Sequence, residues 1–344
     1  MLTIVMGAVA GEFLVELAER LAVPCDPAPI HAILERACGG QLNSRRPDGR
    51  RASTLTTSGI PFEASVSGGC GELAPALRYV TETATQENEF ASRVSAQLAA
   101  IPDLVAWLPN GDESVSDMLR SFVATLYPDP AEVPARHRFA TWLGVVHHAG
   151  APNRAARLKV YGNLKLVPGA LHRLCELWPG FVGLVSVPEG EKLIKPVGAA
   201  IEVDALGNVN HKVYLRARHH DVGVPMKLVR YFGDAAWEVL SELVRCGVDA
   251  AELHEHDFMV CCARSTGAPE FGLYLAPRQD DELTRIVREL ASRHHGTTHG
   301  VDALPRAADA CGATWRYSLV GMGFSADRGI DKLNVYGIPA WSAA

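Results

Sequence analysis

Five pairs of extended segments recur along this chain, and a short stretch rich in Gly, Asn, Asp or Pro joins the two members of each pair. Such stretches between runs of β-forming residues predict hairpins. The predicted hairpins pair residues 58–68 with 76–84, 138–148 with 156–164, 195–204 with 210–218, 256–265 with 269–278, and 313–325 with 330–339. Segments with helical periodicity lie in the gaps, at residues 11–22, 86–101, 114–127, 169–178, 234–247 and 280–295. We therefore expect an internally repeated structure with ten strands.

Polar and apolar side chains alternate within these strands. The odd positions of 158–164 and the even positions of 210–216 carry lysine, tyrosine and other polar side chains, whereas the intervening positions are mostly apolar. Because successive residues of a strand point to opposite faces, each set occupies one face of a sheet. The helical segments need an apolar face to cover, so the polar faces would converge on a shared interior. A closed ten-stranded barrel is wide enough for a small-molecule chamber, and an ordinary α+β sheet with a solvated polar face is the alternative.

Such a chamber would collect the cationic side chains of Arg78, Lys159, Lys212 and Lys332. Unpaired cations are costly to bury. They therefore indicate a polyanionic ligand, and phosphate or diphosphate is the natural candidate.

Aromatic and acidic residues complete the predicted chamber. Tyr161, Tyr214, Tyr274 and Tyr336 occupy comparable places on four strands, and aromatic faces stabilise carbocations. Glu63 lies on the polar face of the first hairpin and could accept a proton, and His147 is a candidate proton shuttle. Together these residues describe a reaction in which a diphosphate leaves, a carbocation forms under an aromatic shield, and an aromatic nucleophile attacks it.

The segments that carry this pattern also carry a family resemblance. TTSGIPFEASVS, LRYVTE, LKVYGN, HKVYLR, FGLYLAP and NVYGIP resemble the strands of the indole prenyltransferases of the dimethylallyltryptophan synthase type, which have the ABBA or PT-barrel fold. The resemblance implies that Glu63 holds the indole N–H and that Arg78, Lys159 and Lys212 bind the diphosphate, with Lys332 as a further ligand. It also implies that the four tyrosines shield the allyl cation, and that no metal cofactor is needed.

Two positions depart from the family pattern. Relatives often carry an arginine where this chain has Asn210, and a glutamine where it has Gly272. Fewer diphosphate ligands put the length of the prenyl donor in doubt.

Composition excludes several other classes of protein. The formal charge of −6 gives no support for nucleic-acid binding. The eight cysteines form no C-x-x-C pair and suggest reduced thiols. The N-terminus lacks the basic region of a signal peptide and no apolar run could span a bilayer, so a cytoplasmic protein is expected. Asp280–Asp281 is interpreted as a helix start, and paired histidines such as His147–His148 lack the spacing of a zinc site.

These observations predict an α+β fold: one PT-barrel domain over residues 1–344, with five helix-helix-hairpin units and helices surrounding a ten-stranded antiparallel β-barrel. The predicted function is transfer of a dimethylallyl group from its diphosphate to an indole, either tryptophan or a tryptophan-derived small molecule or peptide. The alternatives are a phenol or hydroxynaphthalene prenyltransferase on the same barrel, and a non-catalytic barrel that binds an anionic metabolite. The expected partners are small-molecule substrates, and the chain is expected to be a monomer or homodimer.

Overall fold

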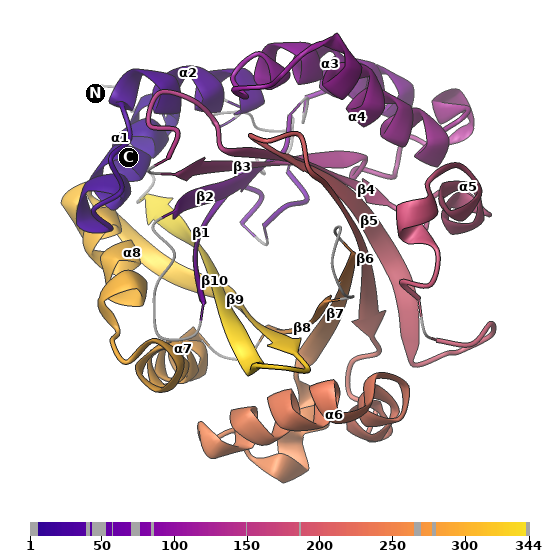
Figure 1. Ribbon diagram of the computed structural model, residues 1–344, viewed down its shortest axis with the longest axis vertical. Helices are drawn as coiled ribbons and strands as arrows, with labels where there is room; N and C mark the ends of the chain where they lie inside the picture. Colours follow the sequence, from indigo (N-terminus) through magenta and orange to yellow (C-terminus); the bar gives the residue numbers. More distant parts are fainter. Residues whose placement is uncertain are drawn as a thin grey trace.

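The strands of this chain close into an antiparallel β-barrel (Figure 1). The computed structural model describes residues 6–38, 42, 53–56, 58–69, 76–83, 86–148, 150–185, 187–264, 270–276 and 280–341. Ten strands lie in the described part, namely β1 (Phe62–Gly69), β2 (Ala76–Thr81), β3 (Thr141–His148), β4 (Arg157–Asn163), β5 (Ile194–Asp204), β6 (Val209–Ala217), β7 (Asp257–Arg264), β8 (Glu270–Ala276), β9 (Ala313–Ser325) and β10 (Gly329–Trp341).

The order of the strands around the barrel follows the sequence. Each strand pairs with the next one, and β1 pairs with β10 to close the circle. The barrel therefore cannot close until segments from both ends of the chain have met. Five consecutive hairpins and a closed barrel confirm the fold expected from the sequence. That residues 1–344 form a single domain stays a prediction.

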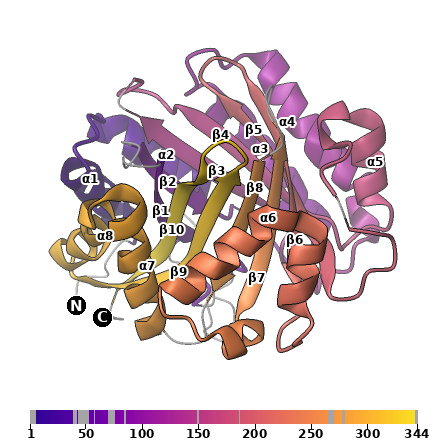
Figure 2. The ribbon, with the colours of Figure 1, turned by 60° about the horizontal axis from the view of Figure 1, so that its bottom comes forward.

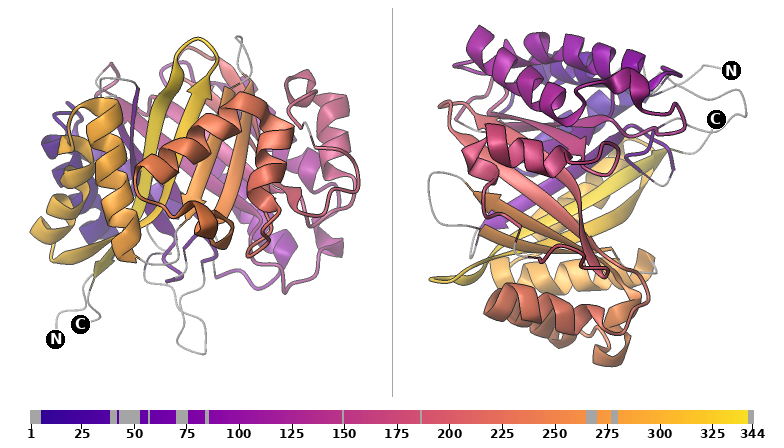
Figure 3. Two further views of the ribbon diagram at one scale, coloured as in Figure 1. Left: turned by 90° about the horizontal axis from the view of Figure 1, so that it is seen from below. Right: turned by 90° about the vertical axis from the view of Figure 1, so that its right-hand side faces the viewer.

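A layer of helices surrounds the barrel (Figures 1, 2 and 3). The helices are α1 (Met6–Arg20), α2 (Pro27–Cys38), α3 (Phe90–Val105), α4 (Glu113–Leu126), α5 (Ala170–Leu177), α6 (Val224–Arg245), α7 (Asp280–His295) and α8 (His299–Ala310). Helix α7 begins at Asp280, as the sequence predicts. No helix in the described ranges combines the length and the apolar character that crossing a bilayer requires.

The repeated units are not identical. Three of the five hairpins follow two separate helices. In the fourth unit α6 is kinked at Gly233, whose φ of 57° and ψ of −138° are not helical, so one long element stands for two helices. In the third unit only α5 and the 3-10 turn Pro179–Phe181 precede the hairpin. The sequence did not predict α2 or α8.

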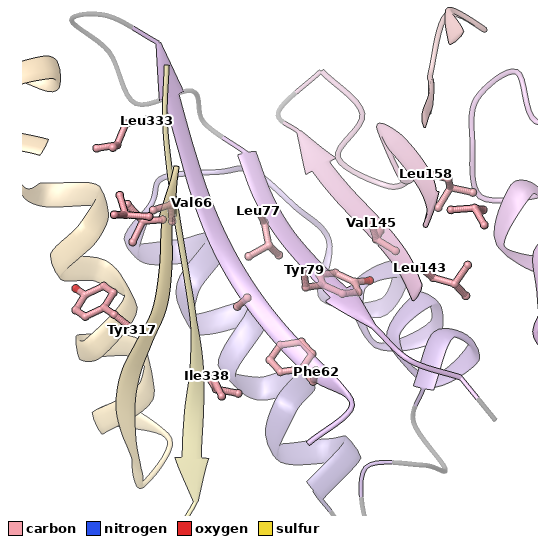
Figure 4. Packing of buried hydrophobic residues seen from close by; sticks show 14 of the residues in the cluster. Phe62, Val66, Leu77, Tyr79, Leu143, Val145, Leu158, Tyr317, Leu333 and Ile338 are labelled. Atoms are coloured by element: carbon pink, nitrogen blue, oxygen red, sulfur yellow. The ribbon is translucent and has the colours of Figure 1, made fainter. Parts of the chain in front are cut away.

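The hydrophobic core lies between the barrel and the helices rather than inside the barrel (Figure 4). Phe62 and Val66 of β1 and Leu77 and Tyr79 of β2 are buried in this layer. The ring of Phe62 packs edge-on against Phe13 of α1, with ring centroids 6.2 Å apart. Since these apolar residues face outward, the alternate positions of the same strands face the interior of the barrel.

The cysteines that the structure describes are free thiols. They are Cys25, Cys38, Cys175, Cys246, Cys261, Cys262 and Cys311. Cys70 lies outside the described residues. These seven agree with the expected reduced thiols, and Cys261 alone among them is part of the packed cluster around Tyr214 inside the barrel.

Candidate active site

Two cavities lie inside the barrel, one toward each end. The first has a volume of about 440 Å³, and its wall includes Glu63, Trp142, Tyr161, Tyr214, Tyr274, Ser318 and Tyr336. The second has a volume of about 550 Å³, and its wall includes Ser67, Arg78, Arg157, Glu270, Arg328, Asp331 and Lys332. Strand β4 shows the order along the barrel, because Arg157 lines the second cavity and Tyr161 lines the first.

A layer of polar side chains separates the two cavities, and we call it the cation layer. It consists of Lys159, Lys212, Glu202 and Asn334, none of which is among the residues that line either cavity. Arg78 joins it from the second cavity by donating a hydrogen bond of 2.9 Å from Nη1 to Oδ1 of Asn334. The expected convergence of Arg78, Lys159 and Lys212 on the barrel interior is thus present in the structure. Lys332 lies at the edge of the group, on the wall of the second cavity.

Glu202 is the carboxylate within the cation layer. Its Oε2 lies 3.2 Å from Nζ of Lys212 and its Oε1 lies 3.5 Å from Nη1 of Arg157. Burial opposes ionisation of this carboxyl, but the charges of Lys212, Lys159 and Arg157 outweigh burial and hold its pKa below the ordinary value. Glu202 is therefore ionised, and it balances only part of the surrounding positive charge.

Positive charge in the layer exceeds what Glu202 compensates. Burial and the neighbouring Lys212 hold the pKa of Lys159 well below its usual range. Burial, Lys212 and Arg78 lower the pKa of Lys332 to about 8. Burial disfavours the charged forms of both lysines, and repulsion from the neighbouring cations adds to this effect. A polyanion placed among them would relieve that repulsion.

Lys159 also connects the cation layer to the tyrosines. Among the described residues it has no carboxylate within ion-pair distance, and its Nζ donates a hydrogen bond of 2.7 Å to the hydroxyl of Tyr214. The same ammonium lies 4.3 Å from the ring centroid of Tyr161 and 5.4 Å from that of Tyr214. These contacts are cation–π geometry. The rings that line the first cavity therefore face the amino group of Lys159 at its floor.

The tyrosines expected to shield a cation all line the first cavity. The ring centroids of Tyr161 and Tyr214 are 5.8 Å apart, and those of Tyr274 and Tyr336 are 6.1 Å apart. Gly321 makes room for Tyr274, since a Cβ at this glycine would lie 2.3 Å from the ring. The four rings give the cavity an aromatic wall, and aromatic faces favour a positive charge.

Trp142 of β3 adds a fifth ring that the sequence analysis missed. It lies opposite Tyr161 in the register of β3 and β4, with ring centroids 6.3 Å apart. It stacks on Phe139 at 4.0 Å. Its indole Nε1 is buried and has no hydrogen-bond partner among the residues that the structure describes. Its pairing with the inward-facing Tyr161 places it on the interior face of β3.

Glu63 faces the first cavity from β1, as expected. Ser318 of β9 donates a hydrogen bond to its Oε1. Burial raises the pKa of this carboxyl to about 7, and the hydrogen bond from Ser318 opposes that rise. A carboxyl with such a pKa can hold or release a proton near neutral pH. Ser318 was also missed, because a bulge between β9 and β10 breaks the alternation near it.

The structure does not bring His147 to either cavity, and this corrects the expected role of proton shuttle. His147 faces outward into the helical layer, and its neighbour Val146 lines the second cavity. Its Nε2 lies 3.3 Å from the hydroxyl of Tyr79, and the two rings are stacked at 5.7 Å. Burial lowers the pKa of this imidazole to about 4. A neutral, packed histidine behind the sheet has no path to a substrate inside the barrel.

The two positions that depart from the family pattern lie on the expected strands. Asn210 pairs with Glu202 in the register of β5 and β6, so it stands beside the acidic member of the cation layer. Gly272 pairs with Cys261 and lies next to the ring of Tyr274. Neither supplies a positive charge to the cation layer.

No three His, Cys, Asp or Glu side chains gather into a potential metal site in the ranges that the structure describes. The site is built instead from cations, phenols and one titratable carboxyl.

Comparison with known proteins identifies the fold. No protein-family model matches the chain, and no curated protein matches its sequence. Solved structures do match: 6-dimethylallyltryptophan synthase from Micromonospora olivasterospora, in complex with DMASPP and Trp, superposes with a TM-score of 0.73 at 20% identity, over 97% of each chain.

Two further structures of similar extent agree. The 5-dimethylallyltryptophan synthase from Streptomyces coelicolor, also with DMASPP and Trp, gives a TM-score of 0.71 at 18% identity over 96% of this chain and 94% of that chain. The prenyltransferase PriB, in a ternary complex with L-tryptophan and dimethylallyl thiolodiphosphate, gives 0.73 at 17% identity over 98% of this chain and 99% of that chain. The chain therefore has the PT-barrel fold of the indole prenyltransferases.

Proposed function

We propose that this protein is an aromatic prenyltransferase that moves a dimethylallyl group from its diphosphate to an indole. The observation that carries the proposal is the placement of the cation layer directly beneath an aromatic cavity that contains one titratable carboxyl. Groups suited to bind a polyanion, to shield a carbocation and to accept a proton thus lie in one barrel. The solved structures that share this fold include tryptophan prenyltransferases with both substrates bound.

The donor would place its diphosphate in the cation layer. Arg78, Lys159 and Lys212 would bind the phosphate oxygens, with Lys332 at the edge of the site. The bond between the allylic carbon and the diphosphate oxygen breaks, and its electron pair goes to the oxygen. The cations stabilise this developing negative charge more than they stabilise the intact donor, which is how they accelerate departure.

The allyl cation would form in the first cavity. Tyr161, Tyr214, Tyr274 and Tyr336 surround that space with aromatic faces and keep water from capturing the cation. An aromatic carbon of the acceptor supplies the electron pair for the new carbon–carbon bond. The ring then loses a proton to the carboxylate of Glu63, which restores aromaticity.

Glu63 would orient the acceptor. In its ionised form the carboxylate accepts a hydrogen bond from the indole N–H, which raises the electron density of the ring. Its raised pKa of about 7 means that the ionised form dominates only above neutral pH. The hydrogen bond from Ser318 fixes the carboxyl in place.

The test is an incubation of the purified protein with dimethylallyl diphosphate and a panel of indoles, in the presence of EDTA. We expect a mass gain of one prenyl unit on at least one indole. The EDTA also tests metal independence, which stays a proposal. Modification of phenols or hydroxynaphthalenes alone would shift the acceptor class, and diphosphate binding without any product would indicate a non-catalytic barrel. If no acceptor gave a product and the protein did not bind diphosphate, the proposal would be overturned.

A further inference from the structure

The two cavities differ in the ligands that their walls can accommodate. On β10, Lys332 lines the second cavity, Asn334 belongs to the cation layer and Tyr336 lines the first cavity. Strand β4 repeats this order with Arg157, Lys159 and Tyr161. On these two strands the cationic residue therefore faces the second cavity, and the aromatic residue faces the first.

Each cavity reaches the surface at its own end. Leu206 and Arg328, at the rim of the second cavity, are 79% and 68% exposed. Lys165 and Arg216, at the rim of the first cavity, are also exposed. Because these rims belong to opposite ends of the same strands, a molecule in the cation layer has two routes to solvent.

We propose that the diphosphate product leaves through the second cavity while the prenylated aromatic product still occupies the first. The inference rests on the proposed function, because it assigns a route to the diphosphate which that function releases. It gives the second cavity a role that is separate from acceptor binding.

Electrostatics favours this route. Arg78, Arg157 and Lys332 line the second cavity next to the cation layer, and Arg328 lies at its rim. The wall also carries Asp204, Glu270 and Asp331, so its cations outnumber its carboxylates by one. Arg157 already forms an ion pair with Glu202, at 3.5 Å, and its side chain is 47% exposed. A diphosphate that leaves the layer would pass from one cation to the next as it regains water, so no step strands an unpaired multiple charge in an apolar space.

The opposite route is unfavourable. A diphosphate leaving by the first cavity would pass four tyrosines and Trp142, and it would have to move around the bound aromatic product. The charged pair nearest that rim offers little attraction to a departing diphosphate. Arg216 is held by both carboxylate oxygens of Asp257, at 3.2 Å and 2.6 Å.

The route can be tested by narrowing one mouth at a time. Ala156 lines the second cavity and Ala276 lines the first, and both are partly exposed. Ala156→Trp and Ala276→Trp are therefore a matched pair of bulky substitutions at opposite ends. Circular dichroism and thermal unfolding would establish that both variants fold. Ala205→Trp, at the turn that also lines the second cavity, replaces Ala156→Trp if that variant does not fold.

The measurement is the association and release of radiolabelled inorganic diphosphate by rapid filtration, without any acceptor. In Ala156→Trp we expect both rates to fall by about tenfold, with a nearly unchanged Kd because the substitution lies outside the cation layer. In Ala276→Trp both rates should stay close to those of the unmodified protein.

Slow exchange in Ala276→Trp with normal exchange in Ala156→Trp would overturn the route, as would normal rates in both variants. Failure of the unmodified protein to bind diphosphate would instead refute the anion site of the proposed function. The two failures are thus distinguishable.

Discussion

In the proposed reaction, the cation layer and the first cavity would act on the two halves of one donor by opposite physical means. The cation layer concentrates charge in a poorly solvated space, and only Glu202 offsets it there. The first cavity has an aromatic wall, and its carboxyl titrates near neutral pH. In the proposed binding mode the bond to be broken would lie at the boundary between them, so the same barrel would stabilise a leaving anion and a cation a few bonds away.

Substitution in the cation layer should have the largest effect. Lys159→Met removes the charge that contacts both Tyr161 and Tyr214 and keeps much of the side-chain volume. We expect turnover to fall about 10³-fold, together with a weaker affinity for inorganic diphosphate, measured by calorimetry. A variant that keeps normal diphosphate affinity would show that the layer is not the anion site.

Substitution in the first cavity should lower turnover without changing the affinity for diphosphate. Glu63→Gln keeps the shape of the side chain but cannot accept a proton. Turnover with an indole should fall about 10²-fold, while the Kd for diphosphate stays the same. If turnover and diphosphate affinity were lost to the same extent, the two regions would not act separately.

The pH dependence of kcat/KM for the acceptor tests the role of the first cavity separately from that of the cation layer. The ionised form of Glu63 is the one that accepts the N–H hydrogen bond, and burial raises the pKa of this carboxyl to about 7. The value of kcat/KM for the acceptor should therefore rise with pH until about 7 and then level off. The rise should be absent in Glu63→Gln. The pH profile of this variant therefore shows whether the rise belongs to Glu63.

Glu202→Gln should strengthen diphosphate binding and lower the stability of the unliganded protein. Its carboxylate repels an incoming anion, so removing the charge should tighten diphosphate binding by about tenfold. The cations it balanced then repel one another, so the unliganded protein should lose about 3 kcal/mol of unfolding free energy. Calorimetry and denaturant unfolding would measure the two effects, and weaker diphosphate binding would contradict the assigned role.

The smallest effect is expected at the wall of the first cavity. A Cβ at Gly321 would lie 2.3 Å from the ring of Tyr274, so Gly321→Ala must displace that ring. We expect a loss of about 1–3 kcal/mol in unfolding free energy and a several-fold increase in hydrolysis of the donor relative to prenylation. The ratio of prenyl alcohol to prenylated product measures the second quantity. Gly272→Ala is the control, because a Cβ at this glycine would lie 3.5 Å from the same ring, in ordinary van der Waals contact.

Alternation made much of this fold predictable, because a two-residue period assigns each strand residue to one face. It failed at β3, where Leu143, Val145 and Val146 are all apolar. The face of His147 therefore could not be decided from the strand alone. Helix α8 was missed because Pro305 interrupts it, and proline in a helix interior is unfavourable.

The site was predictable where repeated motifs marked it and not elsewhere. Lys-x-Tyr pairs led to Lys159, Tyr161, Lys212 and Tyr214. Glu202 carries no such motif, although its alternation with Ala200 and Gly198 places it inside the barrel. Its partnership with Lys212 depends on the register of β5 and β6, which the sequence analysis did not establish.

A crystal structure with dimethylallyl thiolodiphosphate tests the central claim most directly. The account predicts phosphate oxygens within hydrogen-bond distance of Lys159 and Lys212, with the dimethylallyl group between the rings of the first cavity. A diphosphate bound on the outer surface, or one whose prenyl group points into the second cavity, would contradict it.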